Sequence, residues 1–184
     1  MMDGGRASWA EPPTLMTERF VLRPHRLEDF PANLEMWNTI NVGVESGLRP
    51  LTREEAWGKF TRGFGFWVLH GRGPLGIIDR ETGEYLGEVG VSDFNRDLAP
   101  SHDHMPEFSW AVTLGARRRG VASEAVARMA AWADENIAAA RCCCLIDVRN
   151  APSIRVAEKA GFAAAYAVDY KGSACTIFER PRRG

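Results

Sequence analysis

The chain has 184 residues, of which 45% are hydrophobic and 26% are charged. This composition is that of an ordinary globular protein and excludes a disordered or fibrous chain, while the length predicts one domain. Twenty-three Lys and Arg residues against 24 Asp and Glu residues leave a net charge of −1, which argues against a dedicated DNA-binding protein.

The hydrophobic runs and the cysteines of the sequence indicate the cellular compartment of the protein. The sequence has no stretch of ~18 uncharged apolar residues that could span a membrane, and its first residues lack the apolar segment of a secretory signal. Three of the four cysteines are consecutive (residues 142–144) and cannot form a disulfide framework. We therefore expect a cytoplasmic protein in which the cysteines at residues 142–144 pack as small hydrophobic residues in the core.

The first half of the chain predicts a tail, two helices and a meander of strands. Residues 1–15 are rich in Gly and Pro and are expected to be a flexible tail before a single domain that covers residues 16–184. Hydrophobic periodicity and a capping box at residues 52–55 set the element boundaries. The expected elements are a strand at 19–23, a helix at 27–37, a helix from 53, and strands at 66–69, 77–78 and 85–92.

The second half predicts alternating strands and helices. After a loop at 95–105, we expect a strand at 108–113, a long amphipathic helix at 122–137, an apolar strand at 142–148, a helix at 151–160, and strands at 162–170 and 174–178. A strand, a helix and a strand in this order predict a right-handed crossover and a parallel strand pair. The expected fold is therefore α+β, with a mixed and mostly antiparallel sheet flanked by helices.

A basic loop before the long helix is the most informative segment. The residues Arg117, Arg118, Arg119 and Gly120 lie between a strand and a helix whose first backbone N–H groups are unpaired and carry partial positive charge. We expect such a loop to bind a phosphate group. The sequence has neither the Gly-Lys-Ser/Thr of a P-loop nor the glycine pattern of a Rossmann turn.

A second motif begins where the apolar strand ends. Asn150 is placed as a helix cap, Pro152 lies in the first turn, and Gly161 ends the helix. Because ligands collect beyond the carboxyl ends of parallel strands, we expect this motif and the basic loop to face one crevice.

These motifs carry a family resemblance. The pattern Arg117-x-x-Gly120-x-Ala122, followed by Asn150-x-x-Ser153 and by Gly161-Phe162, resembles the GNAT superfamily of N-acetyltransferases. The opening residues 17–24 are similar to the start of its RimJ/RimL branch. The resemblance runs from about residue 15 to 178 and implies an acetyl-CoA-dependent N-acetyltransferase whose parallel strand pair is splayed.

The resemblance also implies where acetyl-CoA binds. Backbone amides of the loop would hold its pyrophosphate, the strand before the loop and Asn150 would contact the pantetheine arm, and Ser153 would lie near the sulfur. The implied cofactor residues are Trp110, Ala111, Val112, Arg117, Arg118, Arg119, Gly120, Val121, Ala122, Ser123, Asn150 and Ser153. The implied reaction is direct attack of a primary amine, from a protein N-terminus or a small molecule, on the acetyl thioester.

Two departures from the family pattern affect the catalytic residues. The branch often has Gly where this chain has Arg118, and many relatives have a tyrosine acid where this chain has Ala157. Ser153 is then the remaining candidate acid, although a helix that starts with Asn-x-x-Ser also has a simple capping role. Glu107 and Glu88, each beside an expected strand of the acceptor side, are the candidate general bases.

Other interpretations of the sequence stay open at this point. One is a non-catalytic CoA-sensing or partner-binding protein that kept the loop, and another is an RNA-associated protein that uses residues 117–119 and 180–183. His102 and His104 lack a third placed ligand, so no metal is expected. Nucleic acid and membrane are not expected partners, and the terminal strands are a candidate surface for a homodimer.

Overall fold

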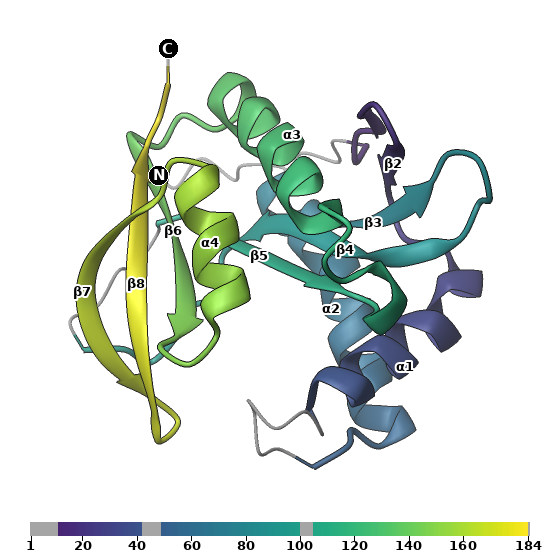
Figure 1. Ribbon diagram of the computed structural model, residues 1–184, viewed down its shortest axis with the longest axis horizontal. Helices are drawn as coiled ribbons and strands as arrows, with labels where there is room; N and C mark the ends of the chain where they lie inside the picture. The colour runs from purple at the N-terminus through teal and green to yellow at the C-terminus, as the bar shows by residue number, and fades with distance from the viewer. Residues whose placement is uncertain (1–10, 42–48, 100–104, 184) are drawn as a thin grey trace, which may run out of the picture.

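The computed structural model describes residues 11–41, 49–99 and 105–183. Its centre is an eight-stranded sheet with the order β1-β2-β3-β4-β5-β6-β8-β7 (Figure 1). The strands are β1 (Leu15–Met16), β2 (Phe20–Arg23), β3 (Pro74–Asp79), β4 (Tyr85–Ser92), β5 (Glu107–Val112), β6 (Arg141–Asp147), β7 (Ala163–Tyr170) and β8 (Ser173–Pro181). Only β5 and β6 run parallel among the described strands, which confirms the predicted mixed sheet.

Four α-helices cover the sheet: α1 (Phe30–Asn41), α2 (Arg53–His70), α3 (Val121–Asn136) and α4 (Ala151–Lys159). Two short 3-10 helices, Leu27–Asp29 and Leu114–Ala116, precede α1 and the basic loop. In Figure 1, α3 and α4 lie on one face of the sheet, and α1 and α2 lie on the other. The long helix, the apolar strand and the capped helix predicted in the second half of the chain are all present.

The main core lies between the sheet and the helices α3 and α4. The apolar stripe of α3 packs on inward side chains of β4 and β5, including Val89, Val91 and Phe108. Cys142 and Cys144 belong to this core, and the predicted burial of residues 142–144 is confirmed. Cys175 is also free and buried. Burial of the apolar stripe supplies the main free energy that holds α3 on the sheet.

The prediction of a strand at residues 66–69 is wrong, because α2 continues through this segment to His70. Ala56, Phe60, Gly63 and Trp67 are its buried residues, and their spacing of four, three and four residues makes one helical stripe. Gly71 ends the helix with a left-handed backbone at φ 62°. The packing of the stripe outweighs the strand preference of the aromatic and β-branched residues near its end.

The predicted tail overlaps the start of the fold. Residues 1–10 lie outside the described residues, but Leu15 is only 5% exposed and pairs with Leu22 across β1 and β2. The pairing places the following loop, which contains Arg19, next to the beginning of α3.

A buried ion pair joins α3, α4 and β8. Arg180 of β8 is 3% exposed; its Nη1 donates to Asp134 of α3 at 2.7 Å, and its Nε donates to the carbonyl of Ala160 at 3.1 Å. The Arg180 guanidinium holds the pKa of Asp134 below its usual value. Arg180 is therefore committed inside the fold and cannot take part in the RNA surface considered from the sequence.

Gly87 sits where β4 bulges against β3 and approaches β5. A Cβ at this position would overlap the carbonyl oxygen of Ala111 and lie 2.9 Å from the Cα of Val112. The register between β3 and β4 shifts at Ile77 and Ile78, opposite this glycine. Only glycine lets the β4 backbone come this close to β5.

We predict that Gly87→Ala lowers the free energy of unfolding by at least ~2 kcal/mol, because the new methyl group meets backbone rather than a side chain that can move. Urea denaturation measures the change. Gly58→Ala is the control: Gly58 lies within α2, and a methyl group added there would have nothing within 4 Å of it. That variant should gain ~0.5–1 kcal/mol. Equal stability of the two variants would contradict the role given to Gly87.

Candidate functional site

The start of α3 is an uncapped helix N-terminus. Gly120 is its N-cap residue, with a left-handed backbone at φ 78°, and no side chain caps the helix. The first hydrogen bond of the helix runs from the Glu124 amide to the Gly120 carbonyl, so the preceding amides of the first turn are open. This arrangement of bare N–H donors is suited to an anion.

Three arginines surround this N-terminus. Arg117, Arg118 and Arg119 are exposed, and none of them has an acidic partner within salt-bridge distance in the described chain. Their charges therefore add to the potential of the helix end instead of being neutralised within the fold. A pyrophosphate group fits this donor set.

The backbone explains why Arg118 is an unusual residue for its position. Arg118 has φ 61°, in the left-handed region that favours glycine. The loop thus carries a cationic side chain on a backbone conformation that glycine adopts more easily.

Arg19 fixes the loop from outside. Its backbone N–H donates to Glu124 Oε1 at 3.0 Å, its Nε donates to Glu124 Oε2 at 2.8 Å, and its Nη1 donates to the carbonyl of Arg119 at 2.9 Å. The ion pair also neutralises the one carboxylate in the first turn of α3. Arg19 thus removes a negative charge from the neighbourhood of the proposed anion.

Strand β5 offers a free edge next to this loop. Glu107 and Cys143 are the only register pair between β5 and β6, and the Cys143 amide donates to the carbonyl of Pro106 at 2.9 Å. Beyond this point the two strands diverge, as Figure 1 shows. Trp110, Ala111 and Val112 pair with β4 on one side and face the opening on the other. This is the splayed parallel pair that the resemblance implies.

Asn150 and Ser153 lie at the start of α4, beyond the end of β6. The Asn150 Oδ1 atom accepts from the Ser153 amide at 3.2 Å, so Asn150 is the N-cap of α4. The capping role weighed from the sequence is therefore present, while contact with pantetheine remains a prediction. Ala157 is fully buried, and its methyl side chain has no proton to give.

Glu88 belongs to a polar group under α1, which we call the Glu88 cluster: His25, Asn33, Tyr85 and Glu88. The Asn33 Nδ2 donates to Glu88 Oε2 at 2.7 Å and to the Tyr85 hydroxyl at 2.9 Å. The His25 Nε2 lies 3.6 Å from the same Glu88 oxygen. The Glu88 side chain is 16% exposed to solvent. In the sheet register, Glu88 lies opposite Ala111 of β5, the strand with the free edge.

Glu107 is placed differently. Both of its carboxylate oxygens accept from the Arg96 guanidinium at 2.7 Å, and Arg96 also donates to the Tyr170 hydroxyl at 2.8 Å. The side chain is 4% exposed and lies at the closed end of the strand pair, opposite Ser92. Oxygens that already accept from a guanidinium are poorly suited to accept a substrate proton.

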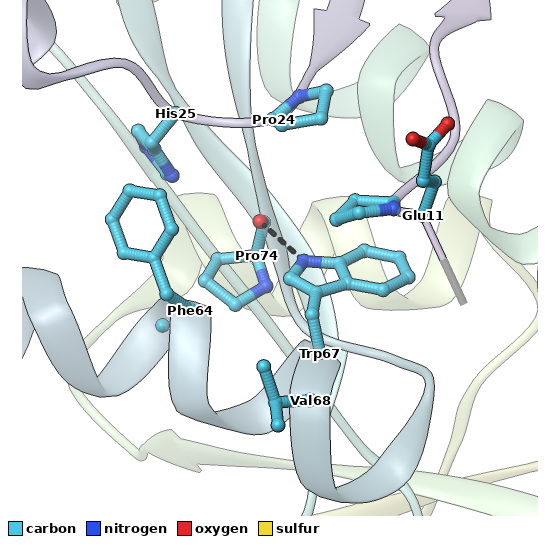
Figure 2. A pocket seen from close by; sticks show the side chains of 9 residues that line it. Glu11, Pro24, His25, Phe64, Trp67, Val68 and Pro74 are labelled. Atoms are coloured by element: carbon cyan, nitrogen blue, oxygen red, sulfur yellow. Dashed lines mark hydrogen bonds between the residues drawn. The ribbon is translucent and has the colours of Figure 1, made fainter. Parts of the chain in front are cut away.

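A cavity of about 390 Å³ lies between the end of β2, the start of β3 and α2, and is lined neither by the basic loop nor by Glu88 or Glu107. Figure 2 shows its mostly apolar walls, where the Trp67 indole N–H donates to the carbonyl of Pro74 at 2.9 Å. His25 lines this cavity and, through Nε2, approaches the Tyr85 hydroxyl at 3.2 Å. His25 therefore belongs both to the Glu88 cluster and to the wall of the cavity.

Metal and thiol chemistry find no support in the described chain. No group of three or more His, Cys, Asp or Glu residues there could hold a metal ion. His102 and His104 lie outside the described residues. Burial raises the pKa of Cys142 to about 11 and raises that of Cys143 and Cys144 further. Within the same ranges, no helix is both long and apolar enough to cross a bilayer.

Several of these residues were missed in the sequence. Arg19 was part of the recognised opening motif, but nothing in the sequence indicated that it reaches Glu124, 105 residues away. Asn33 gave a weak signal, because a polar residue between Phe30 and Trp37 falls on the inward side of the helix. His25 lies two residues after the end of β2, and nothing in the sequence indicated its role.

Comparisons with known proteins agree with this geometry. The family model described as an acetyltransferase (GNAT) domain matches residues 19–163. A GnaT-family acetyltransferase structure from Bordetella pertussis is 32% identical, with a TM-score of 0.81, and the match covers 91% of this chain and 99% of that one. An acetyltransferase structure from Agrobacterium tumefaciens is 29% identical, with a TM-score of 0.75 and coverage of 91% and 93%.

A more distant structure bears on the RimJ/RimL branch. RimL, a ribosomal L7/L12 α-N-protein acetyltransferase in complex with coenzyme A, has a TM-score of 0.72 over 92% of this chain and 98% of its own. Its identity is 12%, so the likeness extends to the fold alone. No curated protein matches the sequence.

The Glu88 cluster predicts a pH effect on stability. Burial lowers the pKa of His25 below its ordinary value of 6.5, although Glu88 opposes the shift. The unfolded chain then binds more protons than the folded one below about pH 6.5, so stability falls as the pH is lowered through this value. We expect the urea midpoint to fall between pH 7 and pH 5.5, and His25→Gln to flatten this dependence. An unchanged slope in the variant would show that other groups cause it.

Proposed function

The chain belongs to the GNAT acetyltransferase family, and from this premise we propose that it is an acetyl-CoA-dependent N-acetyltransferase that acts on a primary amine. The observation that carries the proposal is the uncapped start of α3 beside the free edge of β5, surrounded by three arginines that have no acidic partner in the described chain. The helix start offers donors for the pyrophosphate of the cosubstrate, and the free strand edge offers backbone groups for its extended pantetheine arm.

In this proposal the chain binds and aims the cosubstrate. The amides of Val121, Ala122 and Ser123, with the three arginines, hold the pyrophosphate, and backbone groups of residues 110–112 pair with the pantetheine arm. Acetyl-CoA supplies the activated acetyl group when bound. An amide of the β5 edge that donates to the thioester carbonyl would favour attack by stabilising the charge that develops on its oxygen.

The acceptor amine must be neutral before it attacks. With ordinary pKa values near 7.8 for an α-amine and 10.4 for lysine, roughly one α-amine in seven is neutral at pH 7 but only about one lysine in 2,500. An α-amine therefore needs only a weak base. The amine attacks the thioester directly, and no covalent bond to the enzyme is formed.

We assign the base to Glu88 in preference to Glu107. Glu88 is partly exposed, lies opposite Ala111 and is oriented by Asn33, whereas Arg96 occupies both oxygens of Glu107. Ser153, at the start of α4, is the proposed acid that protonates the departing thiolate, directly or through water. Asn150 would contact the pantetheine arm beside it.

We also propose that the protein is a RimJ/RimL-like member of the family that works in the cytoplasm. The opening segment around Arg19, which clamps the loop through Glu124, supports the first proposal. Four free, buried cysteines are consistent with a reducing compartment.

The loop assignment predicts the effect of a charge at Gly120. Gly120→Glu should abolish acetyl-CoA and CoA binding, because the carboxylate stands where the pyrophosphate would lie. In a thermal shift assay the wild type should be stabilised by acetyl-CoA or CoA, by ~4 kcal/mol at about 1,000 times the dissociation constant, and not by NAD or ATP.

Gly71→Glu is the matched control for this experiment, because Gly71 has a similar left-handed backbone at φ 62° but lies at the end of α2. The control should bind CoA like the wild type. Retained affinity in Gly120→Glu, or no CoA effect on the wild type, would refute the loop assignment.

The base assignment predicts a second result. Glu88→Gln should lower kcat about 100-fold, as expected for loss of a general base, with CoA affinity unchanged. Release of free thiol over a panel of amines and peptides measures this. If Glu107→Gln instead removes turnover in a protein that stays folded, Glu107 is the base. A wild type that binds CoA but acetylates nothing in the panel would favour the CoA-sensing alternative.

A further inference from the structure

Trp37 presents a buried hydrogen-bond donor without a partner. Its indole Nε1 atom is shielded from solvent, and no acceptor meets it in the described chain. Trp67 shows the ordinary outcome for such a group, because its indole N–H donates to the carbonyl of Pro74. Buried donors are rarely left unsatisfied, so an unpaired one calls for an acceptor that the chain itself does not provide.

Lys59 brings an unpaired cation to the same place. Its Nζ atom lies 3.1 Å from the centre of the Trp37 ring, and no acidic oxygen of the described residues lies within salt-bridge distance of it. Burial lowers the pKa of Lys59 to about 8, so the ammonium form still predominates at pH 7. An ammonium that is already desolvated gains more from an incoming anion than an exposed one does.

The charges around Lys59 also favour an anion. Glu88 attracts the ammonium, while Arg62 and Arg96 repel it. Glu107 is already paired with Arg96 and does not form an ion pair with Lys59, so Glu88 is the carboxylate that acts on Lys59, from beyond salt-bridge distance. A second anion on this face would satisfy Lys59 without competing with the Arg96 pair.

Trp37 and Lys59 lie next to the Glu88 cluster. Asn33, which donates to Glu88, and Trp37 are four residues apart on α1 and therefore share one face of the helix, with ~5–6 Å between their Cβ atoms. Lys59 lies over Trp37 and is within electrostatic range of Glu88, so the two donors are neighbours of the base candidate. We call Trp37, Lys59 and Glu88 the acceptor strip.

We infer that Trp37 and Lys59 bind the carboxylate of the acceptor, so that the acceptor is a free amino acid. The inference rests on the proposed function, because it extends the same site. The two oxygens of a carboxylate accept from the indole N–H and from the ammonium, while the amine lies toward Glu88.

Other amines fit this strip less well. A polyamine would place its second ammonium against Lys59, and like charges repel at this distance. A protein N-terminus would offer a neutral peptide group, which gives the ammonium no counter-charge. Lys59 lies over the ring on a flexible four-carbon stem, so its ammonium can move to meet a carboxylate that binds the indole N–H.

Indole N–H signals in ¹H–¹⁵N spectra test the inference without any turnover. Trp37→Phe identifies the Trp37 signal in the full chain, and the twenty amino acids and their α-amides are then added singly to wild-type protein with CoA. We expect at least one amino acid to shift the Trp37 signal, with no shift from its amide. The Trp67 signal is the internal control, since its N–H is already bonded. No shift with any amino acid, or equal shifts with acid and amide, would overturn the inference.

Kinetics separate this subsite from the transferase proposal. Lys59→Met should raise KM for amino acid acceptors at least 10-fold with little change in kcat. The affinity for acetyl-CoA should stay the same, and so should kcat/KM for the poorer acceptors that lack a carboxylate. Lys159→Met, at the exposed end of α4, is the control and should behave like the wild type. If Lys59→Met impairs α-amide acceptors as much as amino acids, the subsite is wrong. If amino acids shift the Trp37 indole signal but the protein never releases thiol, the proposed function is wrong and the carboxylate subsite is still supported.

Discussion

The divergence of β5 from β6 is the constraint on which the rest of the site depends. The strands pair at Glu107 and Cys143 and separate beyond them, so β5 keeps a backbone edge that β6 does not use. In a continuous parallel sheet this edge would be consumed by ladder hydrogen bonds. The crossover places the start of α3 at the open end of the gap, and the start of α4 follows the end of β6 at the same end. The separation of β5 from β6 therefore brings together the free edge of β5, the N-terminus of α3 and the capped start of α4.

Several interactions hold this separation in place. At the closed end, Arg96 ties Glu107 to the Tyr170 hydroxyl and so joins β5 to the end of β7. On the other side of β5, Gly87 allows β4 to approach closely enough to keep a full antiparallel ladder. At the open end, Arg19 fixes the loop before α3. β5 is thus held on one side by sheet pairing while its other side stays exposed to a ligand.

The second half of the fold could be read from the sequence because each element there has one dominant local signal. The apolar stripe of α3, the continuous apolar run of β6 and the Asn-x-Pro start of α4 all predict the observed structure. Residues 66–69 were misread, because four apolar residues in a row suit a buried strand as well as a helix end. Burial of Trp67 in register with Phe60 decides between them, and that register is a tertiary property.

The backbone of the basic loop before α3 could be predicted from the sequence, and the arrangement of side chains under α1 and α2 could not, for a physical reason. The loop depends on backbone geometry over seven consecutive residues, so its pattern is local. Glu88, Asn33 and Lys59 come from three elements, and only packing of α1 and α2 on the sheet brings them together. The sequence placed Glu107 ahead of Glu88 as the candidate base, whereas the position of Arg96 favours Glu88.

The burial of all four cysteines has a practical consequence for work on this protein. Thiolates are the species that react with disulfide reagents, and burial keeps these sulfurs protonated and shielded. A colorimetric reagent such as an aromatic disulfide would therefore report coenzyme A liberated in solution with little background from the polypeptide. The same shielding makes the folded chain a poor target for inhibitors that alkylate cysteine.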